Sequence, residues 1–309
     1  MQSNNTVRVL IIGEILVICV LSIIILLRNK PSTLGIYINK IDKKNIKFKE
    51  VRALKNFYEP QPNLKEVINK EWLQEDAVIT INSDTLNERF EYPILKPDNT
   101  YRIMTLGDSL TYGLNVSTEY NWTEVLEDEL NNIKNCKVNF EVVNLGVQGY
   151  DTEFTVERFN LRGKKYDPDL VIWFVTDIER MTDETLENTK KINIDENKLE
   201  SEGKFYEAWN FASRAVFKKY GRDKIVQFQE KQFLRFFELY SGPILFIADN
   251  LNRPSERVLE NKYVTIIEPG NGMDLKYRLP DGHMNIEGNR IFGQEIAKYL
   301  LSSKTISCN

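Results

Sequence analysis

Residues 102–113 read Arg-Ile-Met-Thr-Leu-Gly-Asp-Ser-Leu-Thr-Tyr-Gly, and this stretch decides the fold. Its first five residues are mostly apolar and predict a short strand, residues 102–106. Gly107 and Asp108 follow, so the strand delivers Ser109 to its C-terminal edge. Small residues at such a place allow a tight turn that brings backbone amides close to a ligand. Gly-Asp-Ser is a weak signal by itself, because an ordinary turn also explains it.

Beyond this strand, apolar segments alternate with helical ones. Further strands are predicted at 140–144, 170–175, 244–248 and 264–267, and helices at 122–131, 152–162 and 286–301. The third strand is hydrophobic throughout, as strands covered on both faces are. Repeated strand–helix units imply an α/β fold with a parallel sheet and helices on both faces. Ligands of such sheets bind beyond the C-terminal ends of the strands.

A long insert, residues 179–240, separates the third and fourth predicted strands. Its second half, residues 206–240, is rich in aromatic residues and is predicted to be helical. These aromatic side chains could line an acyl or sugar groove, but their helical spacing favours a packing face. They are Trp209, Phe211, Phe217, Phe228, Phe233, Phe236 and Phe237.

Composition excludes several classes of function. The 309 residues, 42% hydrophobic and 28% charged, suffice for a full core, and a net charge of −4 argues against a dedicated nucleic-acid binder. With His283 as its one histidine, the chain cannot build His-rich zinc or copper sites. The three cysteines lack metal-binding spacing, and a disulfide between Cys136 and Cys308 rests on their number alone. We expect no metal, no cofactor and no nucleic-acid partner.

The N-terminus predicts a membrane anchor. Residues 9–27 are almost wholly aliphatic, close to the roughly 20 residues that span a bilayer as a helix. Arg28 and Lys30 follow directly, without the small-residue cleavage site of a signal peptide. We therefore predict an uncleaved transmembrane helix within residues 1–30, and thus a single-pass membrane protein; a buried core helix is the alternative.

The sidedness of the membrane is less constrained. The positive-inside rule, applied to Arg28 and Lys30, would keep the following domain in the cytoplasm. Long domains can translocate despite such charges, and we expect an extracytoplasmic catalytic domain. Residues 31–100 are interpreted as a stalk or N-terminal extension packing on the main domain, residues 101–303. Within this extension, residues 63–72 predict a weak helix and residues 77–81 a strand.

Three more segments place chemistry near strand ends. Residues 144–149 follow the second strand, residues 175–177 follow the third, and Asp281-Gly282-His283 precedes the last helix. Histidine is the side chain whose unperturbed pKa allows proton exchange near neutral pH. If the protein uses imidazole chemistry, the base is therefore His283.

Taken together with Ser109, these segments resemble the SGNH (GDSL-type) hydrolase superfamily, in particular its membrane-anchored bacterial members. The resemblance covers about residues 82–301. It implies a flavodoxin-like three-layer α/β/α sandwich with a five-stranded parallel sheet. It also implies hydrolysis of esters and thioesters, and some related families transfer or remove acetyl groups on polysaccharides.

The resemblance further implies roles for individual residues. Ser109 matches the nucleophile, and its backbone N–H matches one donor of the oxyanion hole. Gly149 matches the second backbone donor. His283 matches the general base, and Asp281 the carboxylate that orients it. This agrees with general chemistry, because a serine hydroxyl is a poor nucleophile until an imidazole takes its proton.

Two positions depart from the family pattern. Thr176 stands where the family has an asparagine of the oxyanion hole, and a hydroxyl is a shorter donor than an amide. Losing one such donor costs roughly 10²–10³ in rate. Asp281 and His283 are separated by one residue rather than two, a spacing that occurs in SGNH-like polysaccharide acetyltransferases. Asn285 is expected to cap the last helix, and Asp177 to be structural.

The leading hypothesis is a membrane-anchored serine esterase or deacylase. It would hydrolyse an ester of a small molecule or carbohydrate, such as an O-acetyl group, through an acyl-serine intermediate. One alternative passes the acyl group to a sugar hydroxyl, as a polysaccharide O-acetyltransferase. The other, supported by Thr176, is a catalytically weak SGNH domain that serves as a binding or assembly module.

Overall fold

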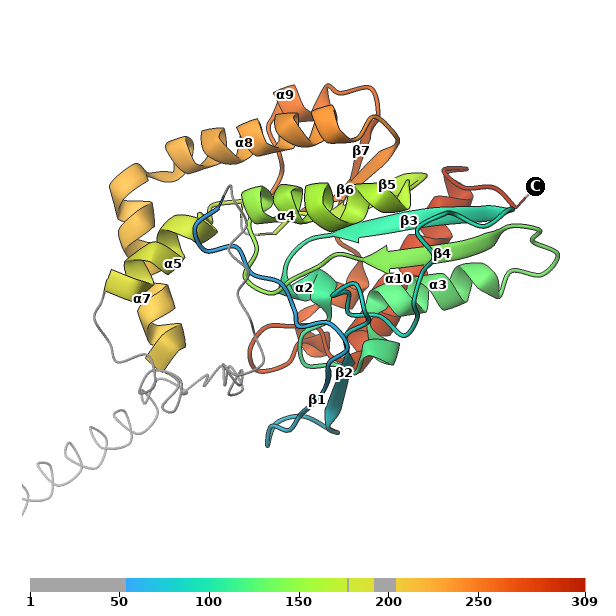
Figure 1. The fold of residues 1–309 in the computed structure, drawn as a ribbon, viewed down its shortest axis with the longest axis horizontal. Helices are drawn as coiled ribbons and strands as arrows, with labels where there is room; N and C mark the ends of the chain where they lie inside the picture. The colour runs from blue at the N-terminus through green and yellow to red at the C-terminus, as the bar shows by residue number, and fades with distance from the viewer. Residues whose placement is uncertain (1–53, 177, 192–203, 309) are drawn as a thin grey trace, which may run out of the picture. The chain divides into compact units, whose positions relative to one another are not determined.

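The computed structural model describes residues 54–176, 178–191 and 204–308 (Figure 1). The predicted anchor in residues 1–30, the first part of the predicted extension, and Asp177 lie outside the described residues. Within the ranges that are described, no helix is long and apolar enough to cross a membrane.

The main sheet forms because five apolar segments pair side by side in parallel. Its order is β4-β3-β5-β6-β7, which is the 2-1-3-4-5 order of flavodoxin-like sheets. The strands are β3 (Thr100–Leu106), β4 (Asn139–Asn144), β5 (Leu170–Phe174), β6 (Ile244–Ile247) and β7 (Val264–Ile267). The predicted five-stranded parallel sheet is confirmed.

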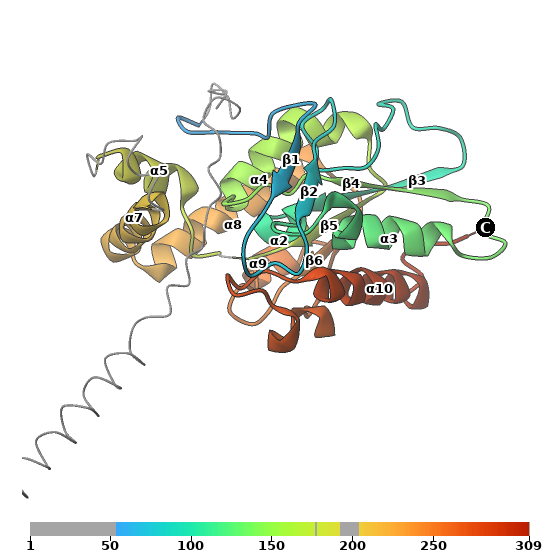
Figure 2. The same cartoon turned by 90° about the horizontal axis from the view of Figure 1, so that it is seen from below.

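Helices cover both faces of this sheet (Figures 1 and 2). The helices are α2 (Ser109–Tyr112), α3 (Trp122–Asn131), α4 (Thr152–Arg158), α5 (Thr182–Lys191), α7 (Lys204–Tyr220), α8 (Arg222–Leu239), α9 (Glu256–Leu259) and α10 (Ile286–Ser302). On one face α3 packs against α10, and the rings of Trp122 and Phe292 lie 5.3 Å apart. On the other face α4 packs against α8, and Phe236 lies 5.1 Å from Trp173 of β5. The three-layer α/β/α sandwich is therefore confirmed.

The insert is helical in its second half, as predicted, and consists there of α7 and α8. Phe233 and Phe236 of α8 are fully buried against the sheet, so the packing interpretation holds for them. Phe211 and Phe217 of α7 are exposed instead. Trp209, Phe228 and Phe237 are half-buried.

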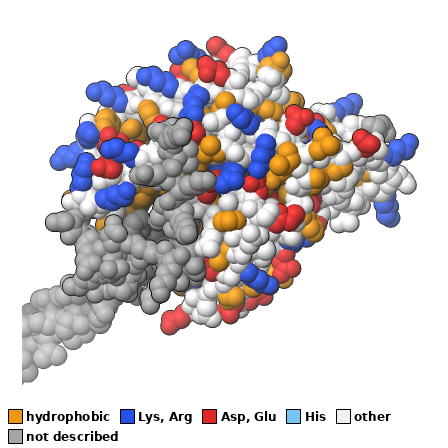
Figure 3. Space-filling model, in the orientation of Figure 1, with side chains coloured by type: hydrophobic (Ala, Val, Ile, Leu, Met, Phe, Trp, Pro, Cys, Tyr) orange, Lys and Arg blue, Asp and Glu red, His pale blue; other side chains and the backbone are white. Residues whose placement is uncertain are grey.

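Charges of both signs are interspersed on the face seen in Figure 3. Ion pairs on the surface of the described residues include Arg257 with Glu230 at 3.1 Å and Arg290 with Glu287 at 2.5 Å. Exposed pairs of this kind contribute at most about 1 kcal/mol each. The stability of the fold therefore rests on the two apolar layers rather than on surface charge.

The predicted helix at residues 63–72 is wrong, because this stretch holds a strand. Here β1 (Lys65–Ile68) pairs antiparallel with β2 (Ala77–Thr80), the predicted strand at 77–81. Ile68 of β1 is buried in one cluster with Ile79 of β2. Four residues are too few for a periodicity to separate strand from helix, and the pairing with β2 decides.

This β1–β2 hairpin is attached to the loop that follows α2. The backbone N–H groups of Val78 and Thr80 donate to the hydroxyls of Ser117 (2.9 Å) and Thr118 (2.8 Å). Tyr112, at the end of α2, is buried in the same apolar cluster as the hairpin. The hairpin thus packs directly behind the turn that carries Ser109.

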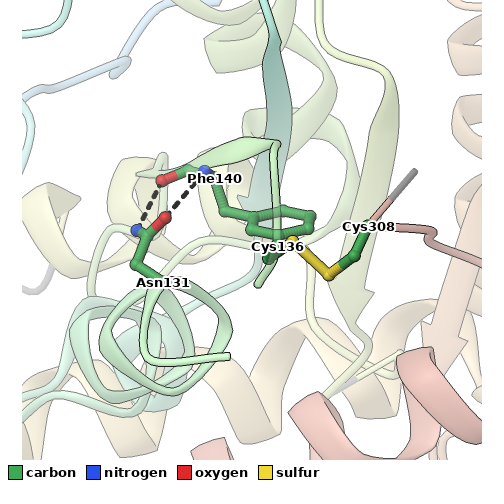
Figure 4. Close-up of a disulfide and its surroundings, with 4 residues drawn as sticks. All are labelled: Asn131, Cys136, Phe140 and Cys308. Atoms are coloured by element: carbon green, nitrogen blue, oxygen red, sulfur yellow. Dashed lines mark hydrogen bonds between the residues drawn. A yellow bond between two sulfur atoms is a disulfide. The ribbon is translucent and has the colours of Figure 1, made fainter. Parts of the chain in front are cut away.

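A disulfide joins Cys136 to Cys308, with Cα atoms 4.6 Å apart (Figure 4). Cys136 precedes β4, and Cys308 follows α10. Next to this bond, the Asn131 side chain exchanges two hydrogen bonds of 2.9 Å with the backbone of Phe140. The bond therefore ties the C-terminus to the edge of the sheet.

Replacing both Cys136 and Cys308 by serine is expected to lower the free energy of unfolding by about 2–4 kcal/mol, because the unfolded chain regains the freedom of a long loop. Thermal unfolding with and without a reductant measures this. The reductant should lower the Tm of the unsubstituted chain and leave that of the double variant unchanged. Equal Tm values for both proteins under oxidising conditions would contradict the prediction.

Candidate active site

Ser109 is the first residue of α2, at the C-terminal edge of β3, and α2 lies at the arrowhead ends of β3 and β4 (Figure 1). The Asp108 carboxylate caps this short helix by accepting from the N–H of Leu110 at 3.0 Å. Gly107 has φ +152°, and a Cβ there would lie 2.9 Å from the carbonyl of Phe174. Only glycine therefore lets the chain turn this close to β5.

His283 is supplied by the loop before α10. That loop closes on itself, because Leu279 donates to the carbonyl of His283 at 2.7 Å and Gly282 donates to that of Leu279 at 2.8 Å. Asn285 caps α10 by accepting from the N–H of Gly288 at 2.8 Å, as expected from the sequence. The cap fixes where the helix begins and so fixes the loop that holds the imidazole.

The structure brings Ser109, His283 and Asp281 together. The Nε2 of His283 lies 2.8 Å from the Oγ of Ser109, and its Nδ1 lies 3.2 Å from Oδ2 of Asp281. The second contact has an ion-pair distance but not the direction of an in-line hydrogen bond. The order of the three groups is that of a serine–histidine–carboxylate triad.

Asp281 is held in its ionised form. Burial by itself would raise the pKa of this carboxyl, but the contacts and charge of His283 and the charge of Lys70 outweigh that effect and lower the pKa below its usual value. The carboxylate also accepts from the backbone N–H of His283 at 3.2 Å. A negative charge beside Nδ1 favours the tautomer in which Nε2 is free to accept the Ser109 proton.

The backbone amides of Ser109 and Gly149 at this edge make no hydrogen bond to another of the described residues. Ser109 occupies the first turn of α2, where N–H groups lack an intrahelical partner. Gly149 has φ +78°, and a Cβ there would lie 2.6 Å from the hydroxyl of Tyr58. Tyr58 donates to the carbonyl of Gln148 at 2.5 Å and so holds the loop after β4.

Thr176 lies two residues beyond the end of β5, the neighbour of β3 in the sheet. Its Oγ1 is buried and, among the described residues, makes no hydrogen bond. A buried hydroxyl without a partner is costly, by about 1–3 kcal/mol. The Thr176 hydroxyl is therefore an unused hydrogen-bond donor near the end of β5, beside the strand that leads to Ser109.

Arg180 links two of these loops, which the sequence did not indicate. Its guanidinium lies 3.5 Å from the carboxylate of Asp108 and donates to the carbonyl of Tyr150 at 3.1 Å. It therefore stands between the turn of Ser109 and the turn of Gly149. No motif marks it, because it lies beyond the third segment, in the insert of residues 179–240.

Asn115 and Lys70 were also missed. Asn115 donates from Nδ2 to Oδ2 of Asp281 at 2.5 Å, and Lys70 donates to Oδ1 of Asn115 at 2.6 Å. Neither residue belongs to a motif, and Lys70 lies in the hairpin that was expected to be helical. The one local signal is the left-handed backbone of Asn115, φ +70°, which asparagine tolerates better than most residues.

No family model and no curated protein sequence matches the chain. Among solved structures, it is similar to TesA, with 12% identity, 64% of this chain and 97% of that chain covered, and a TM-score of 0.42. It is similar to the esterase EstA from Pseudoalteromonas, with 12% identity, 68% and 100% covered, and a TM-score of 0.42. It is also similar to an acetyl-xylooligosaccharide esterase, Axe2, from Geobacillus, with 12% identity, 67% and 95% covered, and a TM-score of 0.38.

Proposed function

We propose that this chain is a serine esterase or deacylase of the SGNH type. The observation that carries the proposal is the 2.8 Å contact between the Ser109 hydroxyl and the one imidazole of the chain. Asp281 on the far side of that imidazole and the free amides of Ser109 and Gly149 complete the machinery for acyl transfer.

The geometry supports a two-step reaction. His283 removes the proton of Ser109 as its Oγ attacks the ester carbonyl, and the N–H groups of Ser109 and Gly149 stabilise the resulting oxyanion. The alcohol leaves with the proton from His283, and the acyl group remains on Ser109. A water molecule, deprotonated by His283, then attacks the acyl-serine and releases the acid, which restores both side chains.

A fluorophosphonate probe tests the proposal directly, because it phosphonylates a serine only where the hydroxyl is activated. The chain should be labelled on Ser109 and should hydrolyse p-nitrophenyl acetate. A chain that is neither labelled nor active would favour the binding or assembly module instead. Product analysis with an acetylated oligosaccharide and a sugar acceptor separates hydrolysis from acetyl transfer.

The membrane association and the extracytoplasmic location are part of this proposal. The disulfide between Cys136 and Cys308 supports the location, since such bonds persist in oxidising compartments. The apolar residues 9–27 support the anchor. An ester on a surface carbohydrate would then be within reach of the enzyme, which is why an O-acetyl group is the substrate class we favour.

Thr176→Val is expected to lower kcat by about 10²-fold with little change in KM, if its hydroxyl is the third oxyanion donor. The same substitution removes a buried hydroxyl without a partner, so stability should rise by about 1 kcal/mol. Steady-state kinetics and thermal unfolding measure the two effects. Thr176→Ser, which keeps the hydroxyl, should retain most of the activity; an unchanged kcat in the valine variant would exclude Thr176 as a donor.

A further inference from the structure

The carboxylate of the triad is not held by its own loop alone. Asn115 donates to Oδ2 of Asp281 at 2.5 Å, the same oxygen that lies 3.2 Å from Nδ1 of His283. Asn115 is 2% exposed, so this hydrogen bond is shielded from water. The position of the Asp281 carboxylate, and with it the imidazole, therefore depends on the loop after α2.

The orientation of the Asn115 amide is fixed in turn by Lys70. The Lys70 ammonium donates to Oδ1 of Asn115 at 2.6 Å, which leaves Nδ2 as the group that faces Asp281. With the amide reversed, its oxygen would face the carboxylate and repel it. Lys70 thus selects the one amide orientation that supports an ionised Asp281.

Lys70 itself is positioned by the β1–β2 hairpin. It lies in the connection between the two strands, half-buried, with its Nζ 4.7 Å from the ring centre of Trp72. Burial lowers the pKa of Lys70, while the charge of Asp281 raises it. The hairpin is hydrogen-bonded to Ser117 and Thr118, just after Asn115. These bonds hold the Lys70 ammonium at a fixed position relative to the Asn115 amide.

We propose that Lys70 and Asn115 are positioning residues of the active site, which carry a positive charge from the N-terminal hairpin to Asp281 and hold its carboxylate against His283. The effect of the two residues on catalysis rests on the proposed function. Their effect on the imidazole of His283 does not, because NMR can measure it without any enzymatic activity. Neither residue touches the substrate or the reacting atoms.

The one histidine of the chain provides the readout. In the full-length chain labelled with [¹⁵N]histidine, NMR reports the tautomer and the titration midpoint of His283 without assignment and without activity. Lys70→Met removes the charge and keeps the length of the side chain. With less positive charge near Asp281, the imidazolium is better stabilised, and the midpoint should rise by about 0.5 pH unit, typical of one charge several ångströms away near a protein surface.

The choice of control variant depends on which charged groups lie near the imidazole of His283. They are Asp281, Lys70 through Asn115, and the pair of Asp108 with Arg180 beside the nucleophile. Lys70→Met changes one of these and leaves the other ion pair intact. The matched control is Lys262→Met, which also removes a lysine lying over an aromatic ring (4.7 Å from Tyr263), far along the chain between α9 and β7.

In the kinetic arm, Lys70→Met should lower kcat for p-nitrophenyl acetate by about 10-fold. This loss is smaller than the roughly 10²-fold that a 1 Å misplacement of a catalytic group costs, because Asn115 still bonds Asp281 in the variant. The acid limb of the pH–rate profile should move upward with the NMR midpoint. Lys70→Arg should restore most of both. Lys262→Met should leave the NMR midpoint, the tautomer and kcat unchanged.

The two proposals fail in different ways. An unchanged midpoint and tautomer of His283 in folded Lys70→Met, shown folded by its Tm, would overturn the role of Lys70 whether or not the chain is an esterase. A shifted midpoint in a chain that neither hydrolyses esters nor reacts with fluorophosphonate would uphold the arrangement and overturn the proposed function. A loss of activity in Lys70→Met without a change in the NMR midpoint or tautomer of His283 would also count against the positioning role of Lys70, because such a loss indicates only a structural defect.

Discussion

Ser109→Ala is expected to lower kcat for p-nitrophenyl acetate by about 10⁶-fold, to a level set by binding and the oxyanion donors alone. In the proposed reaction, the substitution removes the atom that attacks the carbonyl and accepts the acyl group. It also removes the 2.8 Å contact to His283. Because Ser109 is half-buried at the end of a strand, loss of its hydroxyl should leave the fold and the Tm nearly unchanged.

Kinetics and labelling measure this loss. The alanine variant should no longer react with fluorophosphonate, whereas Ser302→Ala at the exposed end of α10 should behave as the unsubstituted chain does. Residual labelling of the Ser109→Ala variant at the unsubstituted rate would show that another serine is the nucleophile. The triad described here would then be structural.

Asp281→Asn is expected to lower kcat by about 10⁴-fold with a small change in KM, as the corresponding substitution does in serine–histidine–aspartate triads. An amide in place of the carboxylate no longer stabilises the imidazolium and permits the wrong tautomer of His283. In this chain the substitution also places two amides, those of Asn115 and residue 281, against each other at a 2.5 Å contact.

The control is Asp274→Asn, which changes the same charge on an exposed turn seven residues earlier. It should leave kcat, KM and the tautomer of His283 unchanged. If Asp281→Asn retained more than about a tenth of the activity, far above the roughly 10⁴-fold loss expected of a triad carboxylate, Asp281 would not orient the base, and the contact at 3.2 Å would be incidental.

The sequence predicted those parts of the molecule that depend on local pattern. The apolar segments around Leu106, Val143 and Ile172 mark strands that are buried on both faces, and the structure places all three in the central sheet. The cap at Asn285 is equally local, since it depends on one side chain and an N–H three residues later. The C-terminal edge as the place of Ser109 followed from the parallel sheet, because such sheets bring their strand ends to one edge. The meeting of Ser109 with His283 was implied by the family resemblance, since His283 lies on the loop before α10 and not at a strand end.

What the sequence did not indicate depends on contacts between distant segments. Residues 65–68 form a strand because β2 pairs with them, and no property of these residues alone requires that. Asn115 and Lys70 lie far from Asp281 in sequence and belong to no motif, so their hydrogen bonds were invisible. The disulfide could not be predicted for the same reason, because nothing in the local sequence of two cysteines 172 residues apart indicates that they lie close together.

The long separation between Ser109 and His283 along the chain has a consequence for synthesis. Ser109 and His283 are 174 residues apart, and at roughly 5–20 residues per second a ribosome needs about 9–35 seconds to synthesise the segment between them. During that interval the strand that carries Ser109 has neither His283 beside it nor α10 packed on its face of the sheet, because both are synthesised later. The hairpin with Lys70 is made earlier still, so the proposed site can be complete only after His283 and α10 have been synthesised.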